Sequence, residues 1–525
     1  MSDQKAQEHD KQVLHNMGYA QELSRRMALF QNFAISFSII CIIAGGITAF
    51  PQALSAGGAF SVVVGWLLGG VMAMLVAVAM GQIGSAFPTA GGLYHWSSIL
   101  GGRAWGWATA WFNFLGLVFV VSSVDVGVYL LFNALVMGPL FSVDLTKLWV
   151  ITLSSSFSID MVQLLVVAVL LITQGLINHL GIRLTTILTD FSGYLILVVA
   201  VLLVIALLAW SPVALDFSRL VRFQNFTGDA GGGFYPTATP YPAFAFLLGL
   251  TFVLYTLTGY DASAHTSEET HDAQINVPRG MWSSVLVSWV AGFIMVATFV
   301  LVIPDIGKAA AQGGNSWFMS VFGASRMPAA LSIILGIGIV LANYLCALAG
   351  LTSCSRMMFA FARDGGMPFS GRLAQVSVKY RTPTNAIWAS VVIAFLSIIY
   401  GGAFAVLAVG CAVFLYISYV MPVAAGLLAE GRTWKEKGPF NLGRWSRPIA
   451  IGAVISAILL AIAGFFPPSD KVFYLTIGMI VVMVAVWFAV ENMRFQGVPK
   501  GDKIIERQSM IAEIEKRYED SSADK

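Results

Sequence analysis

The sequence predicts an all-α integral membrane protein with twelve transmembrane helices. Of the 525 residues, 58% are hydrophobic and only 11% are charged, whereas a soluble domain has about 25% charged residues. Twelve apolar runs have about the length that a helix needs to cross a hydrocarbon core of about 30 Å. This composition excludes a soluble enzyme, and it also excludes a disordered chain, which needs low hydrophobicity and high net charge.

The twelve runs are separated by polar or Gly/Pro breaks and divide into a first group of five and a second group of seven. The first group is 29–54, 59–83, 105–136, 160–178 and 184–210. The second group is 243–264, 281–304, 329–354, 385–400, 403–429, 448–466 and 471–490. The separation at 401–402 is the weakest, because only a short Gly turn divides two runs there.

The basic residues predict the orientation in the membrane. With an even number of spans, 24 of the 30 Lys and Arg residues fall in segments on the same side as both termini. Cytoplasmic loops carry such an excess, so we expect both termini in the cytoplasm of a multi-pass protein in the plasma or inner membrane. The net charge of +3 gives no indication of a nucleic-acid partner; the lipid bilayer is the expected environment.

The expected organisation has six parts. They are a cytoplasmic tail (1–28), a first repeat of helices 1–5 (29–210), an extracytoplasmic loop (211–242), a second repeat of helices 6–10 (243–429), helices 11 and 12 (430–490) and a cytoplasmic C-terminal tail (491–525). The loop contains Gly231, Gly232 and Gly233 and is expected to be irregular. The C-terminal tail has mixed charge and is expected to form a surface helix.

The sequence lacks the motifs of several other classes of protein. The four cysteines lie in apolar runs without metal-ligand spacing, and no metal or cofactor is expected. There is no phosphate-binding GxxxxGK(S/T) loop, which argues against an ATP-driven pump. A membrane-embedded enzyme would need an intramembrane Ser/His/Asp set, a GxGD pair or HExxH, and none is present.

Two apolar runs are interrupted in matching places of the two groups. The first contains the adjacent Gly45 and Gly46, and the sixth contains Thr258, Gly259 and Asp261. A lone glycine pair more often serves close helix packing. Broken helices in corresponding positions of two halves, however, indicate a transport site. Amides freed at the break suit a carboxylate and freed carbonyls suit an ammonium or a cation, so the pair suits a small zwitterion or amine.

Four stretches resemble the amino acid–polyamine–organocation superfamily, especially its amino acid/choline branch with the fungal GABA and choline permeases. They are SAFPTAGGLYHW at 85–96, TGYDASAH at 258–265 with SEET at 267–270, PRG at 278–280, and AFARDG at 360–365 with Pro368, TP at 382–383 and NA at 385–386. The resemblance implies a leucine-transporter-type fold of two inverted five-helix repeats plus two extra helices. It also implies transport by alternating access.

The resemblance also implies which residues contact the substrate. The implied residues are Ile42, Ala44, Gly45, Gly46, Asn113, Tyr255, Thr256, Leu257, Thr258 and Gly259. Amides near Gly45 would bind the carboxylate, and the carbonyls of Ile42 and of the stretch from Thr256 to Gly259 would receive the amino group. Tyr255 corresponds to an aromatic gate. Relatives often have Gly-Ser-Gly where this chain has Ala44-Gly45-Gly46, which removes a hydroxyl donor and leaves a backbone clamp.

The coupling ion stays open between H⁺ and Na⁺. Some proton-coupled relatives carry a lysine in helix 5, but the matching position here is about Ile196 and this span contains no lysine. The hydroxyls of Thr352 and Ser353 are candidate sodium ligands, although hydroxyls in apolar helices more often bond to the preceding turn. Uncoupled exchange is the third alternative.

Acidic residues in the spans indicate a functional or structural role, since burying a carboxylate in a bilayer costs about 2.5–3.5 kcal/mol or more. Asp125 is interpreted as a proton acceptor or ion ligand, or alternatively as a packing hydrogen bond to neighbouring Ser or Thr. Asp190 is expected to pair with Arg183. Asp261 is expected to contact an amine or to cap the half-helix that follows it.

A charged cluster follows Asp261 at the predicted cytoplasmic end of the sixth span. Glu268, Glu269, His265 and His271, with Arg103, Arg363 and Asp364, form either a salt-bridge gate or a solvated rim. None of the six histidines falls within the middle of a run, which argues against a proton relay centred on histidine.

The leading hypothesis is a permease that imports amino acids or related amines such as GABA, coupled to H⁺ or Na⁺. The alternatives are a choline or polyamine transporter and an amino-acid exchanger, and less favoured are a transporter-like sensor and a channel.

Overall fold

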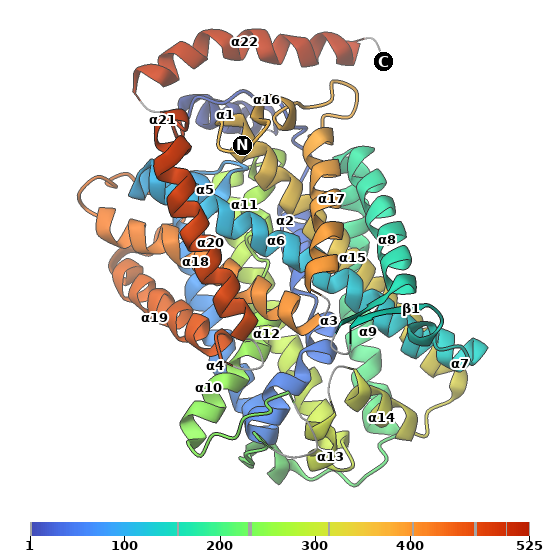
Figure 1. Cartoon of the computed structure of the whole chain (residues 1–525). Helices are drawn as coiled ribbons and strands as arrows, with labels where there is room; N and C mark the ends of the chain where they lie inside the picture. The colour runs from blue at the N-terminus through green and yellow to red at the C-terminus, as the bar shows by residue number, and fades with distance from the viewer. Residues whose placement is uncertain are drawn as a thin grey trace.

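The computed structural model of the chain describes residues 3–154, 157–228, 234–312, 315–401, 404–466, 470–499 and 501–523 and is a bundle of helices (Figure 1). Gly231, Gly232 and Gly233 of the predicted irregular loop, and Gly402 of the predicted turn, lie outside these residues. The all-α membrane class is confirmed.

The first half of the chain forms the predicted spans. Its elements are α2 (Leu29–Ile40), α3 (Ile42–Thr48), α4 (Phe50–Ala86), α5 (Gly92–Gly101), α6 (Arg103–Phe132), η1 (Asn133–Met137), α7 (Gly138–Phe141), η2 (Leu145–Lys147), α8 (Met161–His179) and α9 (Ile182–Ala209). Gly57 and Gly58 have non-helical backbone angles inside α4, with φ of 63° at Gly58. This kink divides the predicted first and second spans.

The second half begins after the 3₁₀ turn η3 (Phe217–Val221). Its elements are α10 (Pro242–Thr256), α11 (Ala262–His265), η4 (Ser267–Glu269), α12 (Ala273–Val302), α13 (Ile306–Ala311), α14 (Ser316–Ala324), α15 (Ala329–Arg363), α16 (Ser370–Leu373), α17 (Thr384–Gly401) and α18 (Phe404–Ala429). The last elements are η5 (Gly443–Trp445), α19 (Ser446–Gly464), α20 (Asp470–Val486), η6 (Trp487–Glu491) and α21 (Asn492–Arg494).

Within the described ranges, ten helical segments are long and apolar enough to cross a membrane. Two shorter apolar helices, Pro242–Thr256 and Thr384–Ile399, fall at predicted spans. The predicted number of twelve therefore depends on whether these two shorter helices also cross.

The halves interlock at the centre of the bundle. Helix α4 packs against α10 and α12, while α6 packs against α15 and α18. The faces that meet are almost entirely apolar and buried, whereas α8, α9 and α20 carry many exposed Leu, Ile and Val side chains. Exposed apolar surface of that extent suits contact with lipid.

Two features outside the spans are absent from the sequence predictions. Strands β1 (Val150–Ser154) and β2 (Phe157–Asp160) form an antiparallel hairpin, with Ile151 opposite Ile159. The short helix α5 contains part of the SAFPTAGGLYHW stretch, and its residues from Gly92 to Ser98 are buried.

Two terminal helices cover one end of the bundle, which we call the terminal face. Helix α1 (Asp3–Asn16) and the predicted C-terminal helix, α22 (Asp502–Ala523), both lie at this end (Figure 1). The carboxylate of Glu515 holds them together. It lies 2.6 Å from Lys11 Nζ and 2.7 Å from His15 Nε2. It also accepts a hydrogen bond from the backbone amide of Gln21 at 2.9 Å.

We expect Glu515→Gln to release α22 from α1. Burial by itself raises the pKa of Glu515, but the hydrogen bonds from Lys11, the Gln21 amide and His15 outweigh it and hold the pKa below its usual value. Because the folded-state pKa is depressed, the contact is complete at neutral pH and is lost only as the pH falls through that value. A hydrogen bond to a charged group contributes roughly 1.5–3 kcal/mol, or about 10- to 100-fold in the docking equilibrium.

Limited trypsin digestion of the full-length protein at neutral pH measures this release. Cleavage after Lys503 and Arg507 should be faster in the variant than in wild type. The control is Glu506→Gln, which changes an exposed carboxylate of the same helix. Equal cleavage rates for the two variants would show that Glu515 does not hold α22.

Candidate functional site

The first interruption lies at Cys41, between α2 and α3. Cys41 has a φ of 26° and precedes the first residue of α3. Its carbonyl accepts a hydrogen bond from the Gly45 amide at 3.3 Å. The predicted unwound residues Ile42, Ala44, Gly45 and Gly46 are therefore helical, which corrects the position of the break. The amides of Ile42 and Ala44 lie in the open first turn of α3, where helices leave N–H groups unsatisfied.

Gly45 and Gly46 serve close packing. A Cβ on Gly45 would lie 2.5 Å from Thr256 Oγ1, and one on Gly46 would lie 2.4 Å from Met295 Cε. Because real Cβ atoms essentially never lie within 3.0 Å of another heavy atom, Gly45 allows α3 to lie directly against α10, whereas at Gly46 the close atom is the flexible end of Met295. The break is displaced from the glycines because they are needed for this contact rather than for an unusual backbone.

The second interruption lies where the sequence predicts it. Helix α10 ends at Thr256, residues Leu257 to Asp261 are not helical, and α11 begins at Ala262. Gly259 has a φ of +93°, and a Cβ there would lie 2.1 Å from Ile39 Cγ2 in the last turn of α2. The two interruptions are thus in direct contact, through Gly45 with Thr256 and through Gly259 with Ile39.

Two tyrosines of α18 bind the backbone of the second interruption. Tyr419 accepts a hydrogen bond from the Gly259 amide at 3.0 Å, and Tyr416 donates to the Leu257 carbonyl at 3.4 Å. On the opposite side, Ser36 of α2 donates to the Tyr260 carbonyl at 3.0 Å. The sequence analysis missed these three residues, because only the fold brings α18 and α2 to the break.

Asp261 forms the polar centre of the site. Its buried carboxylate accepts hydrogen bonds from Asn113 Nδ2 at 2.9 Å and from the Tyr419 hydroxyl at 2.8 Å. His265 Nε2 lies 3.2 Å from the same carboxylate. Asn113, the predicted substrate contact, therefore contacts Asp261. His265, which the sequence places at a predicted helix end, is completely buried beside this carboxylate.

The predicted gate Tyr255 is buried close to the break, and its hydroxyl lies 3.5 Å from Ser123 Oγ. Thr258 donates to the Tyr255 carbonyl, and Thr256 donates to the Phe252 carbonyl. The two threonine hydroxyls therefore bond back to the preceding turn, and their backbone rather than their side chains faces the interruption.

Two ion pairs close the terminal face beside the interruptions. Arg363 binds Glu268 through two hydrogen bonds of 3.0 and 2.8 Å, and Arg356 binds Glu269 through two of 3.1 Å. Both glutamates and Arg356 are completely buried. The alternative of a solvated rim is therefore wrong for Glu268 and Glu269, and Arg356 is a partner that the sequence analysis missed.

Other residues of the predicted gate have different partners. Arg103 donates to Asn492 Oδ1 at 2.8 Å, beyond the last span. Asp364 accepts from Tyr19 and Tyr94 and pairs with Arg507 of α22 at 3.2 Å. The guanidinium of Arg363 lies over the ring of Tyr19, 4.0 Å from its centre. Helix α22 thus reaches Asp364, next to Arg363, through Arg507, and Tyr19, which follows α1, contacts Arg363 directly.

Asp125 and Asp190 are the remaining intramembrane candidates. Asp125 is buried and accepts from Gln174 of α8 at 2.7 Å, rather than from a neighbouring Ser or Thr. Asp190 accepts from Gln31 at 3.0 Å, which replaces the expected pairing with Arg183. In both cases the partner lies on another helix, and only the tertiary structure identifies it.

The candidate sodium ligands differ from one another. Thr352 donates to Asn178 Oδ1 at 2.8 Å, and the same amide oxygen lies 3.3 Å from Arg356 Nη1. The Ser353 hydroxyl is buried without a hydrogen-bond partner among the described residues. A guanidinium therefore already shares the polar environment of Thr352.

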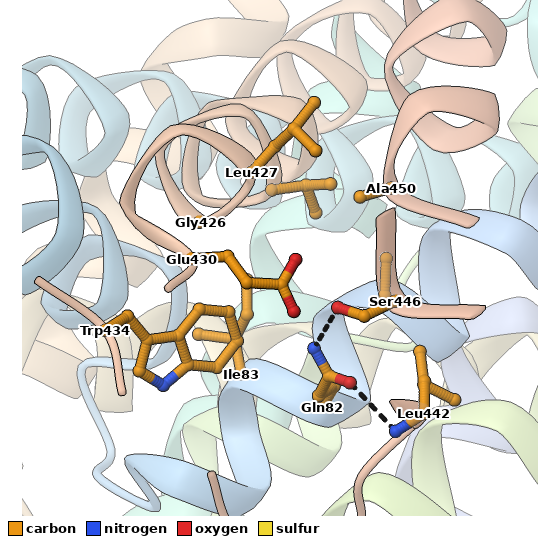
Figure 2. Close-up of a pocket in the computed structure, with 11 residues that line it drawn as sticks. Gln82, Ile83, Gly426, Leu427, Glu430, Trp434, Leu442, Ser446 and Ala450 are labelled. Carbon is orange, nitrogen blue, oxygen red and sulfur yellow. Dashed lines mark hydrogen bonds between the residues drawn. The ribbon is translucent and has the colours of Figure 1, made fainter. Parts of the chain in front are cut away.

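A small pocket between α4, α18 and α19 lies outside this site (Figure 2). It is lined by Gln82, Glu430, Trp434 and Ser446 among others, and Gln82 donates to Ser446 at 2.8 Å. Its volume of about 10 Å³ has room for about one water molecule. The pocket is thus too small for an amino acid.

Within the described residues, no group of three or more His, Cys, Asp or Glu side chains is placed to hold a metal ion. The four cysteines are buried and free.

Comparisons with known proteins agree with the geometry. Residues 27–490 match the family model described as amino acid permease. The chain is 32% identical over 494 residues to the amino-acid permease BAT1 of Arabidopsis thaliana, covering 90% of this chain and 91% of the relative. It is 31% identical to the BAT1 homolog of Oryza sativa subsp. japonica, covering 92% and 94%. It is 29% identical to the GABA-specific permease of Saccharomyces cerevisiae, covering 87% and 79%.

Proposed function

The chain belongs to the amino acid permease family and is a multi-pass membrane transporter of amino acids rather than an enzyme, and from this premise we propose that it imports amino acids or amines such as GABA by alternating access. The observation that carries the proposal is the contact between two interrupted helices, one from each half of the chain. Interruptions in corresponding places are how transporters of this architecture form a substrate site.

The proposed substrate site lies between these interruptions. The free amides in the first turn of α3, from Ile42 to Ala44, are suited to the carboxylate, and Gly45 and Gly46 follow directly after them. The carbonyls of Thr256, Leu257, Thr258 and Gly259 are suited to the amino group, with Tyr255 as the gate. Asn113 acts on this site through its hydrogen bond to Asp261.

The proposed orientation places the terminal face, with both termini, in the cytoplasm of a cell whose plasma or inner membrane holds the protein. The excess of Lys and Arg on this side supports it. The chain then crosses twelve times, as repeats 29–210 and 243–429 followed by two helices in 430–490. In this orientation the Glu268–Arg363 and Glu269–Arg356 pairs keep the site closed to the cytoplasm.

Transport assays in proteoliposomes test this function. Radiolabelled amino acids, GABA, choline and putrescine are each assayed for exchange at equal pH and for net uptake. Exchange of an amino acid or GABA supports the proposal. Exchange of choline or putrescine alone would replace it with the amine alternative, and the absence of any exchange in folded protein would contradict it.

Transport is expected to continue when Na⁺ is replaced by K⁺. Arg356 shares Asn178 with Thr352, and a sodium ion at Thr352 would be repelled by the nearby guanidinium. The measurement compares initial uptake rates in the two salts at the same pH and membrane potential. A strict requirement for Na⁺ would return Thr352 and Ser353 to the role of ion ligands.

A further inference from the structure

We propose that Asp261 and His265 together hold one exchangeable proton, and that binding and release of this proton couple proton movement to transport. The inference rests on the proposed function and adds the coupling ion and its site. It is carried by the hydrogen-bond geometry of two side chains that are both completely buried.

The surroundings of His265 fix the position of one ring proton. Nδ1 lies 3.1 Å from the carbonyl oxygen of Ala90. A carbonyl can only accept a hydrogen bond, so Nδ1 carries a hydrogen. The other nitrogen, Nε2, lies 3.2 Å from the Asp261 carboxylate. In a neutral imidazole with hydrogen on Nδ1, Nε2 is an acceptor and faces a second acceptor.

One more proton is needed to join Nε2 to Asp261. It resides on His265, giving an imidazolium beside a carboxylate, or on Asp261, giving a carboxylic acid beside a neutral ring. In either form the pair is neutral overall and holds one proton between Nε2 and Oδ2. When that proton leaves to water, two lone pairs remain face to face in a buried site, and the arrangement becomes unfavourable.

The other contacts of Asp261 are compatible with both the protonated and the deprotonated carboxyl group. Asn113 Nδ2 and the Tyr419 hydroxyl donate to the two carboxylate oxygens. Asn113 Oδ1 is buried without a hydrogen-bond partner among the described residues, so rotation of this amide presents an acceptor when the neighbouring group carries a hydrogen. These contacts hold the carboxyl group in place while its proton comes and goes.

The pair lies between the substrate site and the closed terminal face. Tyr419 joins Asp261 to the Gly259 amide within the second interruption. On the other side, Ala90 accepts from His265 through its carbonyl and donates its amide to Glu268 Oε1 at 3.0 Å. Glu268 binds Arg363. The loss of the proton therefore acts on the broken helix and on the ion pair together.

Several charged and titratable groups lie on the elements around the pair. Glu268 and Glu269 of η4 are paired with Arg363 and Arg356 of α15. Helix α2 contains no charged residue, and Asp272 and Arg279 at the start of α12 are exposed. The other titratable groups on the packed elements include Tyr94 and His95 of α5, Arg103, Asp125 and Tyr129 of α6, Tyr344, Cys346 and Cys354 of α15, and Tyr260, Tyr416, Tyr419 and Cys411.

The test uses the full-length protein in proteoliposomes and the radiolabelled amino acid that exchanges fastest in the panel above. With the membrane potential clamped at zero, an inward gradient of about two pH units should give up to ~100-fold accumulation for one proton per substrate, because each unit is a factor of ten. Asp261→Asn preserves the shape of the side chain and removes the proton site. We expect the pH gradient to give no accumulation of substrate in this variant.

The matched control is Asp190→Asn, which removes a different acid from the membrane region and should accumulate substrate as wild type does. His265→Gln provides a second variant and should also lose accumulation. Asp125→Asn tests the competing carboxylate. Gradient-driven accumulation by Asp261→Asn, or its loss in Asp125→Asn alone, would overturn the assignment.

Wild-type protein distinguishes the failure of this inference from failure of the proposed function. Exchange at equal pH tests the function without involving the proton. If wild type exchanges but a pH indicator inside the vesicles records no proton entry with substrate, the function stands and the proton site is wrong. Where neither variant folds, this measurement still decides whether proton movement is coupled to transport.

Discussion

Gly259→Ala is expected to slow transport strongly while the protein still reaches the membrane. The residue has a φ of +93°, and the new Cβ would lie 2.1 Å from Ile39 Cγ2. A left-handed backbone costs an L-residue roughly 1–2 kcal/mol, and overpacking costs roughly 1–3 kcal/mol more. Both costs arise at the contact between the interruptions, so we expect the uptake rate to fall at least about tenfold.

Gly102→Ala is the matched control for this variant. Gly102 has nearly the same φ, +92°, but no atom lies within 4 Å of its Cβ position, and the residue is outside the interruptions. It carries the backbone cost without the clash. Purified amounts and gel-filtration profiles establish folding for both proteins. If both variants transport at the same rate, the close contact of Gly259 with Ile39 is not needed for function.

Arg356→Met is expected to destabilise the protein by about 3–5 kcal/mol, the usual effect of removing one partner of a buried ion pair. Both side chains of the Arg356–Glu269 pair are completely buried, and they share two hydrogen bonds. Without the guanidinium, Glu269 remains as an unpaired charge among apolar side chains. A marked fall in the thermal unfolding midpoint in detergent measures this effect.

The double variant Arg356→Met/Glu269→Leu separates the cost of the unpaired charge from that of lost packing. Because it removes both charges, much of the stability should return. The comparison is Lys308→Met in the Lys308–Asp305 pair, whose side chains are 85% and 52% exposed, and this change should cost at most about 1 kcal/mol. Additive losses in the double variant would show that the stability comes from packing and not from the pair.

The sequence predicted the segments of this bundle better than their interruptions. Long apolar runs predict membrane helices because the bilayer satisfies no backbone hydrogen bonds. The break at Leu257–Asp261 was predictable, since Gly259 takes a backbone conformation that other residues avoid. The break at Cys41 was not, because Cys41 carries no such signal and the adjacent glycines act in packing. The hairpin at Val150–Asp160 was missed for lack of any long apolar run.

Among the candidate site residues, the sequence identified several charged side chains but not their partners. Asp261, Glu268 and Arg363 stood out as charges near membrane spans, and the structure brings them to one region. Their partners did not stand out. Tyr419 is one aromatic among many, Arg356 is one basic residue of thirty, and His265 lay among the charges of a predicted helix end.

The sequence by itself therefore determined the class of protein and its family, since these depend on local hydrophobicity and contiguous motifs. The tertiary structure alone decided that Gly259 meets Ile39, that Ala90 lies between His265 and Glu268, and that Asp261 shares its carboxylate with Asn113 and Tyr419. These contacts join residues up to about 220 positions apart. The physical reason is that a buried polar group must find its partner wherever the packing of the helices places one.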